Sequence, residues 1–329
     1  MARSRIFTRL LLSVSFSLAA GWACAADAVT VGYQTGIDPT KVPQADGAYE
    51  KATGRAIQWR KFDSGADLIA AIASGDVAIG NIGSSPLAAA ASRGLPIETF
   101  LVADEIGSAE ALVARNGSGV SKPQDLVGKK VAVPFVSTTH YSLLAALNHW
   151  GIPQNQVKVL NLRAGEIAAA WQRGDIDAAY VWDPALGKIK PSGKVLVGSD
   201  QVAKWGAPTY DIWVVRKDFA AAHPEFVSRF AKVSLDAIAG YLANPPAFIA
   251  KADNIAKISR LTGAAAPDVV AGLKGNRFLG RDEQIALLQS PFVLAVGKTA
   301  AFLKSQGKVE ALQADYGPYV TNRFVKTSR

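Results

Sequence analysis

The stretch AVPFVSTTHYSLLAALNHW, residues 132–150, sets the interpretation of the whole chain. Its first residues, 132–136, are β-prone, and Ser137-Thr138-Thr139 then lead directly into an apolar-periodic helix. Hydroxyl side chains at a helix start cap its free N–H groups. Such a start also favours an oxyanion, because unpaired N–H donors and the positive end of the helix dipole meet there. The stretch therefore predicts a strand–turn–helix unit suited to a small anion.

Strands alternate with helices on both sides of this stretch. Short apolar runs predict strands in a first series at 28–33, 57–61, 77–82 and 97–102, and in a second series at 130–134, 157–162 and 178–181. Apolar-periodic segments between them predict helices. From residue 224 the chain reads as mainly helical to its end, with helices predicted over 224–242, 245–261, 282–303 and 310–316. This alternation predicts an α/β fold of mostly parallel sheets flanked by helices.

Two further predicted strands, 110–115 and 210–216, bracket the second series. If both cross between two lobes, lobe I is discontinuous (residues 26–112 and 214–329) and lobe II covers residues 113–213. Ligands of open α/β sheets bind outside the carboxyl ends of the strands, and pockets form preferentially between domains. We therefore expect a ligand cleft between the lobes, closed by a hinge at the two connecting strands.

The N-terminus resembles an export signal over residues 1–25. Three arginines precede an apolar run, residues 10–20, that is too short to span a bilayer, and Ala23-Cys24-Ala25 fits a cleavage site. Acylation of Cys24, as in a lipoprotein, is the alternative. Cleavage would lower the net charge from +9 to +9 − 3 = +6 and remove the only Cys. A periplasmic protein is therefore expected, and nucleic acid is not an expected partner because no dense Lys/Arg run is present.

Several long runs carry a family resemblance, among them VGYQTGIDPTKVPQADGAYEK (31–51), AAWQRGDIDAAYVWDPAL (169–186) and WGAPTYDIWVVRKDFAAAHPE (205–225). In these runs the chain resembles periplasmic solute-binding proteins of ABC importers, in the branch that serves sulfonates, nitrate and thiamine precursors. The resemblance implies a two-lobed type II periplasmic binding protein, a monomer without cofactor or catalysis, which delivers its ligand to the permease subunits in the inner membrane. It implies taurine as the ligand; an alkanesulfonate or a related small anion is the alternative.

An aminosulfonate such as taurine needs opposite environments at its two ends. The sulfonate offers three acceptor oxygens and no donor, so neutral donors and helix N-termini are enough to hold it. The ammonium offers three donors and is best held by a carboxylate, an aromatic face or both.

Hydroxyl, amide and imidazole side chains are the candidates for the sulfonate. Ser84 and Ser85 lie between a strand and a helix that Pro86 would start, and Thr138 and Thr139 offer the matching helix start in the second lobe. Plain helix capping is the alternative for both motifs. For Gln34 the alternative is an exposed turn residue, and for His140 it is a structural histidine. The full set is Gln34, Ser84, Ser85, Thr138, Thr139 and His140.

Asp211 is the main candidate for the ammonium. It interrupts the apolar strand YDIWVVR, where an unpaired carboxylate would be destabilising. A structural salt bridge or a solvent-facing strand start is the alternative. Trp182 is a candidate cation–π wall or else a core residue, and Glu110 is a second carboxylate candidate or else part of a hinge salt bridge.

An enzyme is the less favoured interpretation. Ser84 or Ser85 could be combined with His140 and Asp211 as a triad of a secreted hydrolase, but the chain has no G-x-S-x-G elbow. His140 and His149 lie nine residues apart, which matches no metal-binding spacing, and no nucleotide-binding glycine motif is present. We therefore expect no catalytic residue and no metal site.

Overall fold

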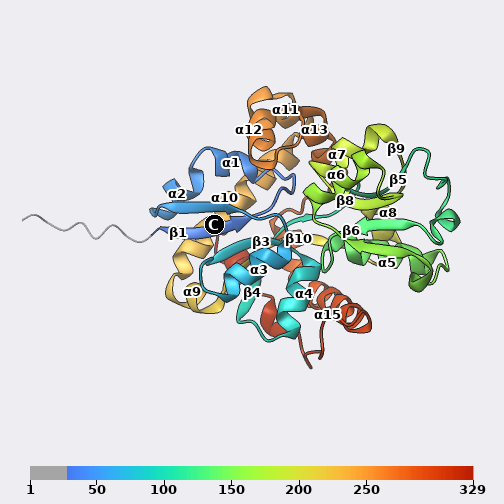
Figure 1. The fold of residues 1–329 in the computed structure, drawn as a ribbon. Coiled ribbons are helices and arrows are strands. Elements are labelled where there is room, and N and C mark those ends of the chain that lie inside the picture. The colour runs from blue at the N-terminus through green and yellow to red at the C-terminus, as the bar shows by residue number, and fades with distance from the viewer. Residues whose placement is uncertain (1–27, 329) are drawn as a thin grey trace, which may run out of the picture.

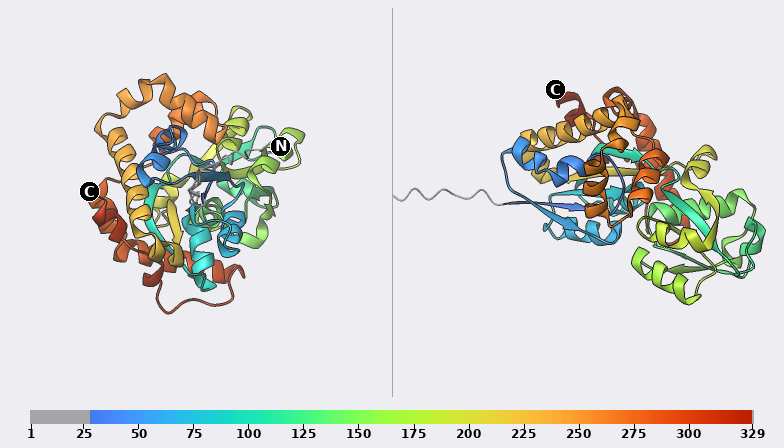
Figure 2. Two further views of the ribbon diagram at one scale, coloured as in Figure 1. Left: turned by 90° about the vertical axis from the view of Figure 1, so that its left-hand side faces the viewer. Right: turned by 90° about the horizontal axis from the view of Figure 1, so that it is seen from above.

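Two five-stranded sheets, each flanked by helices, form two lobes in the computed structural model, which describes residues 28–328 (Figure 1). Figure 2 shows lobe II, in green, beside the larger lobe I, which combines the N-terminal and C-terminal parts of the chain. This arrangement confirms the predicted α/β architecture. The expected signal segment, residues 1–25, lies outside the described residues.

The sheet of lobe I contains four parallel strands and one antiparallel strand. Its order is β2 (Ile57–Lys61), β1 (Val29–Tyr33), β3 (Ile79–Gly83), β10 (Tyr210–Arg216) and β4 (Ile97–Glu105). Only β10 runs against its neighbours. The helices within this first part of the lobe are α1 (Lys41–Ala45), α2 (Ala48–Thr53), α3 (Gly65–Ala73) and α4 (Ser84–Ser92).

Lobe II repeats this plan within one continuous stretch of chain. Its order is β7 (Lys158–Asn161), β6 (Lys130–Val133), β8 (Ala178–Trp182), β5 (Glu110–Arg115) and β9 (Gly193–Gly198), and only β5 is antiparallel to its neighbours. Its helices are α5 (Thr138–His149), α6 (Ala164–Arg173), α7 (Ala185–Ile189) and α8 (Ser199–Lys204), with short 3-10 turns at Pro123–Leu126, Gln154–Gln156 and Lys190–Ser192.

The chain crosses between the lobes at residues 106–109 and 205–209. Strand β5 pairs only with strands of lobe II, and β10 pairs only with strands of lobe I. The boundaries expected at 112/113 and 213/214 therefore fall inside strands, and the connecting segments lie a few residues earlier. Each antiparallel strand follows its crossover directly, so both connections end at the edge of the cleft.

The C-terminal part of the chain is helical and completes lobe I. Its helices are α9 (Lys217–Ala222), α10 (Pro224–Ala243), α11 (Pro245–Ala250), α12 (Ala252–Thr262), α13 (Ala266–Gly275), α14 (Arg281–Leu287), α15 (Ser290–Ser305) and α16 (Arg323–Thr327), with a 3-10 turn at Gly317–Tyr319. Within residues 28–328 no single helix is long and apolar enough to cross a membrane; only the bent pair of α14 and α15 meets that test of length and composition.

Buried aromatic side chains join the C-terminal helices to the sheet of lobe I. Trp213 of β10 packs edge-on against Phe230 of α10, with ring centroids 5.0 Å apart, and both are almost fully buried. Helix α15 also reaches the other lobe, where Phe302 packs edge-on against Tyr141 of α5 at 4.9 Å. Burying rings of this size contributes strongly to stability, so these contacts fix the frame on which the cleft is built.

Candidate functional site

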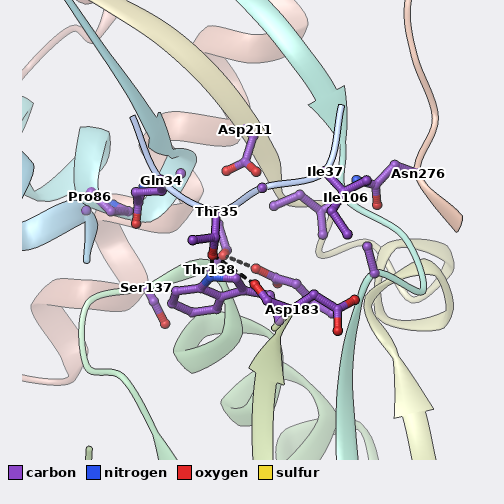
Figure 3. Close-up of a pocket in the computed structure, with 16 residues that line it drawn as sticks. Gln34, Thr35, Ile37, Pro86, Ile106, Ser137, Thr138, Asp183, Asp211 and Asn276 are labelled. Atoms are coloured by element: carbon purple, nitrogen blue, oxygen red, sulfur yellow. Dashed lines mark hydrogen bonds between the residues drawn. The ribbon is translucent and has the colours of Figure 1, made fainter. Parts of the chain in front are cut away.

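A cavity lies between the two lobes at the ends of their strands (Figure 3). Its volume of about 40 Å³ corresponds to roughly three or four water molecules, so it suits a ligand of few atoms. Lobe I lines it with Gln34, Thr35, Gly36, Ile37, Gly65, Gly83, Pro86, Asp211 and Asn276; lobe II and the first crossover line it with Ile106, Ala109, Glu110, Ser137, Thr138, Trp182 and Asp183.

One end of the cavity presents the start of α4. The residue before this helix, Gly83, has no side chain to cap it, and no side-chain cap bond is present. Gln34 lies beside this end (Figure 3) and donates its Nε2 hydrogen to the backbone oxygen of Asn81 at 3.3 Å. Because the first N–H groups of a helix have no partner within the helix, a buried uncapped start is an anion-binding geometry.

The start of α5 approaches the same end from lobe II. Ser137 caps this helix by accepting the backbone N–H of His140 at 3.1 Å, and its own hydroxyl donates to Pro134 O at 2.6 Å. The preceding Val136 has a φ of +62°, which is strained for a β-branched residue and is characteristic of functional sites. The strained turn orients Ser137 and Thr138 toward the cavity.

Carboxylates occupy the other part of the cavity. Asp211 projects into it from β10 (Figure 3), and among the described residues none donates a hydrogen bond to its carboxylate. Burial raises the pKa of Asp211 to about 6, while Lys41 opposes the rise and Asp38 adds to it. An unpaired carboxylate at a cavity wall is a site for a cation, because a bound positive charge would relieve the desolvation.

Glu110 is the second carboxylate of the cavity and comes from lobe II. Its two oxygens accept the Thr138 hydroxyl at 2.6 Å and the Ser199 hydroxyl at 3.3 Å. Burial raises the pKa of Glu110 to about 8 against these two hydrogen bonds, and Asp211 contributes to the rise. Glu110 therefore holds Thr138 in place and takes part in no salt bridge among the described residues, in contrast to the hinge salt bridge considered above.

Direct contacts join the lobes across the cleft. The Thr35 hydroxyl of lobe I donates to the backbone oxygen of Asp183 at 2.8 Å and accepts the indole N–H of Trp182 at 3.1 Å. Gly83 lies so close to Thr138 that an added Cβ would be 2.7 Å from Thr138 Cγ2. The structure therefore has a closed cleft, and Trp182 contributes a polar contact as well as an aromatic wall.

The cavity brings together five of the nine residues that the sequence singled out, namely Gln34, Glu110, Thr138, Trp182 and Asp211. The other four do not line it. Ser84 is buried and its Oγ accepts the Tyr210 N–H at 3.3 Å, and Thr139 is turned toward the Ser137 hydroxyl at 2.7 Å. Ser85 is fully buried next to the cavity at the start of α4, and its Oγ has no hydrogen-bond partner among the described residues.

His140 has a structural environment instead of a ligand-facing one. Its ring stacks on Phe135 at 4.6 Å and its Nδ1 accepts the Val136 N–H at 3.4 Å. Burial, with a contribution from Lys308, lowers the pKa of His140 to about 4. In this geometry His140 does not line the cavity, and it makes no described contact that would complete a Ser–His–Asp triad.

Charged residues beneath the cavity were not recognised from the sequence. Asp38 and Lys41 form a buried salt bridge at 2.9 Å, and Asp104 lies fully buried behind Asp211. The segment IDPTK carried a signal for the first pair, because it places an acidic and a basic residue three positions apart in the turn that leads into α1. Asp104 follows the apolar run of β4, and only the pairing with β10 reveals its neighbour.

The chain is similar to known binding proteins over most of its length. The family described as NMT1/THI5 like matches residues 51–247. The taurine-binding periplasmic protein of Escherichia coli (strain K12) is 56% identical over 298 residues, which are 91% of this chain and 92% of that protein.

Solved structures show the same fold. The alkanesulfonate-binding protein SsuA from Xanthomonas axonopodis pv. citri, bound to MOPS, superposes with a TM-score of 0.73 at 21% identity over 87% of this chain and 96% of that chain. The aliphatic sulphonate binding protein SsuA from Escherichia coli gives 0.71 at 19% identity over 89% and 92%.

Proposed function

Because this chain belongs to the NMT1/THI5-like family, we propose that it is a periplasmic solute-binding protein that captures taurine and delivers it to the permease of an ABC importer. The relative at 56% identity is a taurine-binding periplasmic protein, which supports both the ligand and the compartment. A cleavable export signal at residues 1–25 is part of this proposal. The protein acts as a monomer by binding and closure, and no chemical step is assigned to it.

The sulfonate is held at the paired helix starts. Backbone N–H groups at the uncapped beginning of α4 and the amide of Gln34 approach from lobe I. The backbone N–H groups at the start of α5, at Ser137 and Thr138, approach from lobe II, because both hydroxyl hydrogens are already donated to Pro134 O and Glu110. The orphaned Ser85 hydroxyl is fully buried at the same helix start and becomes satisfied if it donates to a ligand oxygen. Neutral donors of this kind stabilise a permanent anion without requiring a buried counter-ion.

The ammonium is held by Asp211, and this carboxylate is the observation that carries the proposal. It lines the cavity without a hydrogen-bond donor from any described residue, so the bound molecule must supply one. Trp182 lines the same cavity and adds an aromatic surface. A site with uncapped helix N–H groups at one end and an unpaired carboxylate at the other is complementary to a zwitterion.

Ligand binding and closure are coupled, because both lobes contribute to each end of the site. Thr138 and Ser137 reach the sulfonate only when lobe II approaches lobe I, and the hydrogen bonds of Thr35 to Trp182 and Asp183 form in the same movement. The closed form then presents both lobes to the permease.

Calorimetry on the mature protein tests this function. Wild type should bind taurine tightly and bind ethanesulfonate and β-alanine much more weakly, since each of these lacks one end of the expected ligand. Asp211→Asn should lose taurine binding and retain ethanesulfonate, whereas Asp236→Asn, at an exposed position on α10, should behave as wild type. Equal binding of ethanesulfonate and taurine by wild type would remove the role of Asp211 and favour a receptor for alkanesulfonates.

A further inference from the structure

A second carboxylate lies directly behind the proposed ammonium anchor. We propose that Asp104 and Asp211 hold one proton between them in the ligand-free protein, and that the ammonium group of the ligand displaces this proton into solvent. The inference rests on the proposed function and deepens it: capture of the aminosulfonate becomes a proton-releasing event.

The sheet register places the two carboxylates together. Strands β4 and β10 are antiparallel, and Asp104 is the pairing partner of Asp211. Residues directly opposite in an antiparallel pair project from the same face, with Cβ atoms about 4.5–5.5 Å apart. Only Asp211 lines the cavity, so Asp104 forms the layer behind it.

Neither carboxylate has a compensating donor in the described part of the chain. Asp104 is 1% exposed, and both of its oxygens lack a hydrogen-bond partner. Asp211 also receives no hydrogen bond from the described residues. A buried ionised carboxylate without a donor is strongly destabilised, so two of them facing each other cannot both be ionised at neutral pH.

The neighbouring charged residues do not neutralise the carboxylates of Asp104 and Asp211. Asp38 from the β1–α1 loop accepts Lys41 at 2.9 Å and the Thr40 N–H at 2.7 Å, so this ion pair is satisfied internally. Glu110 faces the pair from lobe II, and its oxygens are occupied by Thr138 and Ser199. Burial raises the pKa of Asp104 well above its usual value; Asp211, Asp38 and Glu110 add to the rise, and Lys41 opposes it.

The bound ammonium replaces the proton in charge and in hydrogen bonding. It supplies N–H donors to Asp211 and a positive charge beside the dyad. This charge offsets the second negative charge that Asp104 acquires, so the displaced proton passes to the buffer. Acidification must then weaken binding of the aminosulfonate, by up to about tenfold per pH unit for one linked proton. Ethanesulfonate has no ammonium, so its binding should not weaken on acidification.

Calorimetric titration between pH 5 and pH 8 tests the shared proton. With taurine, wild type should release protons on binding, seen as a difference in binding enthalpy between phosphate and Tris buffers at the same pH, and its affinity should fall as the pH is lowered. Asp104→Asn removes the second titrating group. It should keep its taurine affinity at pH 8 within a few fold, release fewer protons on binding than wild type, and retain only the pH dependence below about pH 6 that comes from Asp211 itself.

Glu98→Gln is the matched control. Glu98 is a buried carboxylate on the same strand, its pKa is also raised by burial, and it pairs with Arg323 away from the cavity. This variant should keep the wild-type pH profile. Glu110, Asp183 and Asp211 also line the cavity and have raised pKa values. All three remain in both variants, so their titration contributes alike to both pH profiles.

The possible outcomes distinguish the proposed function, taurine binding, from the proposed shared proton. No taurine binding at pH 8 would refute the proposed function and the shared proton with it. Tight taurine binding without proton release in wild type, or an unchanged pH profile in Asp104→Asn, would refute the shared proton and leave the function standing. The proton count in wild type decides the matter even if Asp104→Asn does not fold.

Discussion

Replacing Gly83 by alanine should block closure while leaving lobe I intact. Gly83 precedes α4 with φ −76° and ψ 160°, a conformation that any residue adopts. The added Cβ would lie 2.7 Å from Thr138 Cγ2 in the opposite lobe, about 1 Å closer than the usual contact between carbon atoms. The clash exists only when the lobes meet, so the open form is not affected.

The cost follows from the size of the overlap. Inserting a methyl group into a well-packed contact typically costs about 1–3 kcal/mol, and about 1.4 kcal/mol corresponds to a tenfold change in affinity. We therefore expect Gly83→Ala to weaken taurine binding by roughly 5- to 150-fold, measured by calorimetry. The thermal unfolding midpoint of the ligand-free protein should change little.

Thr138→Ser provides the rescue. Serine keeps the hydroxyl that donates to Glu110 at 2.6 Å and removes the methyl group that causes the overlap. The double variant Gly83→Ala/Thr138→Ser should recover most of the lost affinity, and Thr138→Ser alone should bind nearly as wild type. The reasoning is refuted if Gly83→Ala binds normally, or if it lowers the ligand-free unfolding midpoint and the second change restores nothing.

Two further changes probe closure and pH stability. Thr35→Val removes two hydrogen bonds across the cleft, each of which contributes about 0.5–1.5 kcal/mol. Release of the ligand, measured by stopped flow, should therefore be faster by roughly 5- to 150-fold. An unchanged release rate would contradict a role of Thr35 in closure. His140→Asn should leave affinity unchanged. The pKa of His140 is about 4 in the folded protein and about 6.5 in the unfolded chain, so between these pH values the unfolded chain binds more protons. Wild type should therefore lose up to about 3 kcal/mol of unfolding free energy as the pH falls from 6.5 to 4. Denaturant unfolding of the variant should lack this loss, and equal losses in both proteins would contradict the assignment.

Local chemistry predicted most of the elements and five residues of the cavity wall. Gln34 and Trp182 were recognisable because each lies at the carboxyl end of a predicted strand, where open α/β sheets form their sites. Glu110 was recognisable as a carboxylate that begins the predicted hinge strand 110–115. Asp211 was recognisable because a carboxylate in an apolar strand requires a partner. These inferences depend only on neighbours in the sequence.

Tertiary contacts decided the features that the sequence did not reveal. Ser85 and Pro86 have the chemistry of a cap and a first helical residue, yet α4 begins at Ser84. Pro86 fits inside the first turn because the N–H it lacks has no helical partner there. His140 is enclosed partly by Phe302 of α15, a contact between distant segments that no local pattern indicates.

The helical C-terminal region shows the same limit. One helix was predicted over 245–261 and another over 282–303, but the chain breaks each of them in two, at Lys251 and at Leu288–Gln289. The segment 310–316, predicted as a helix, is irregular. Such breaks depend on how a helix packs against the lobe, since apolar periodicity continues on both sides of each break.

The position of β10 has a consequence for the order in which the protein can assemble. Lobe II obtains all of its strands from one contiguous segment, beginning with β5. The sheet of lobe I has β10 between β3 and β4, so β4 has no neighbouring strand until the chain has passed through the other lobe and returned at Tyr210. Closing so long a loop is entropically unfavourable. Lobe I is therefore the part of the nascent chain that stays incomplete longest, although its synthesis begins first.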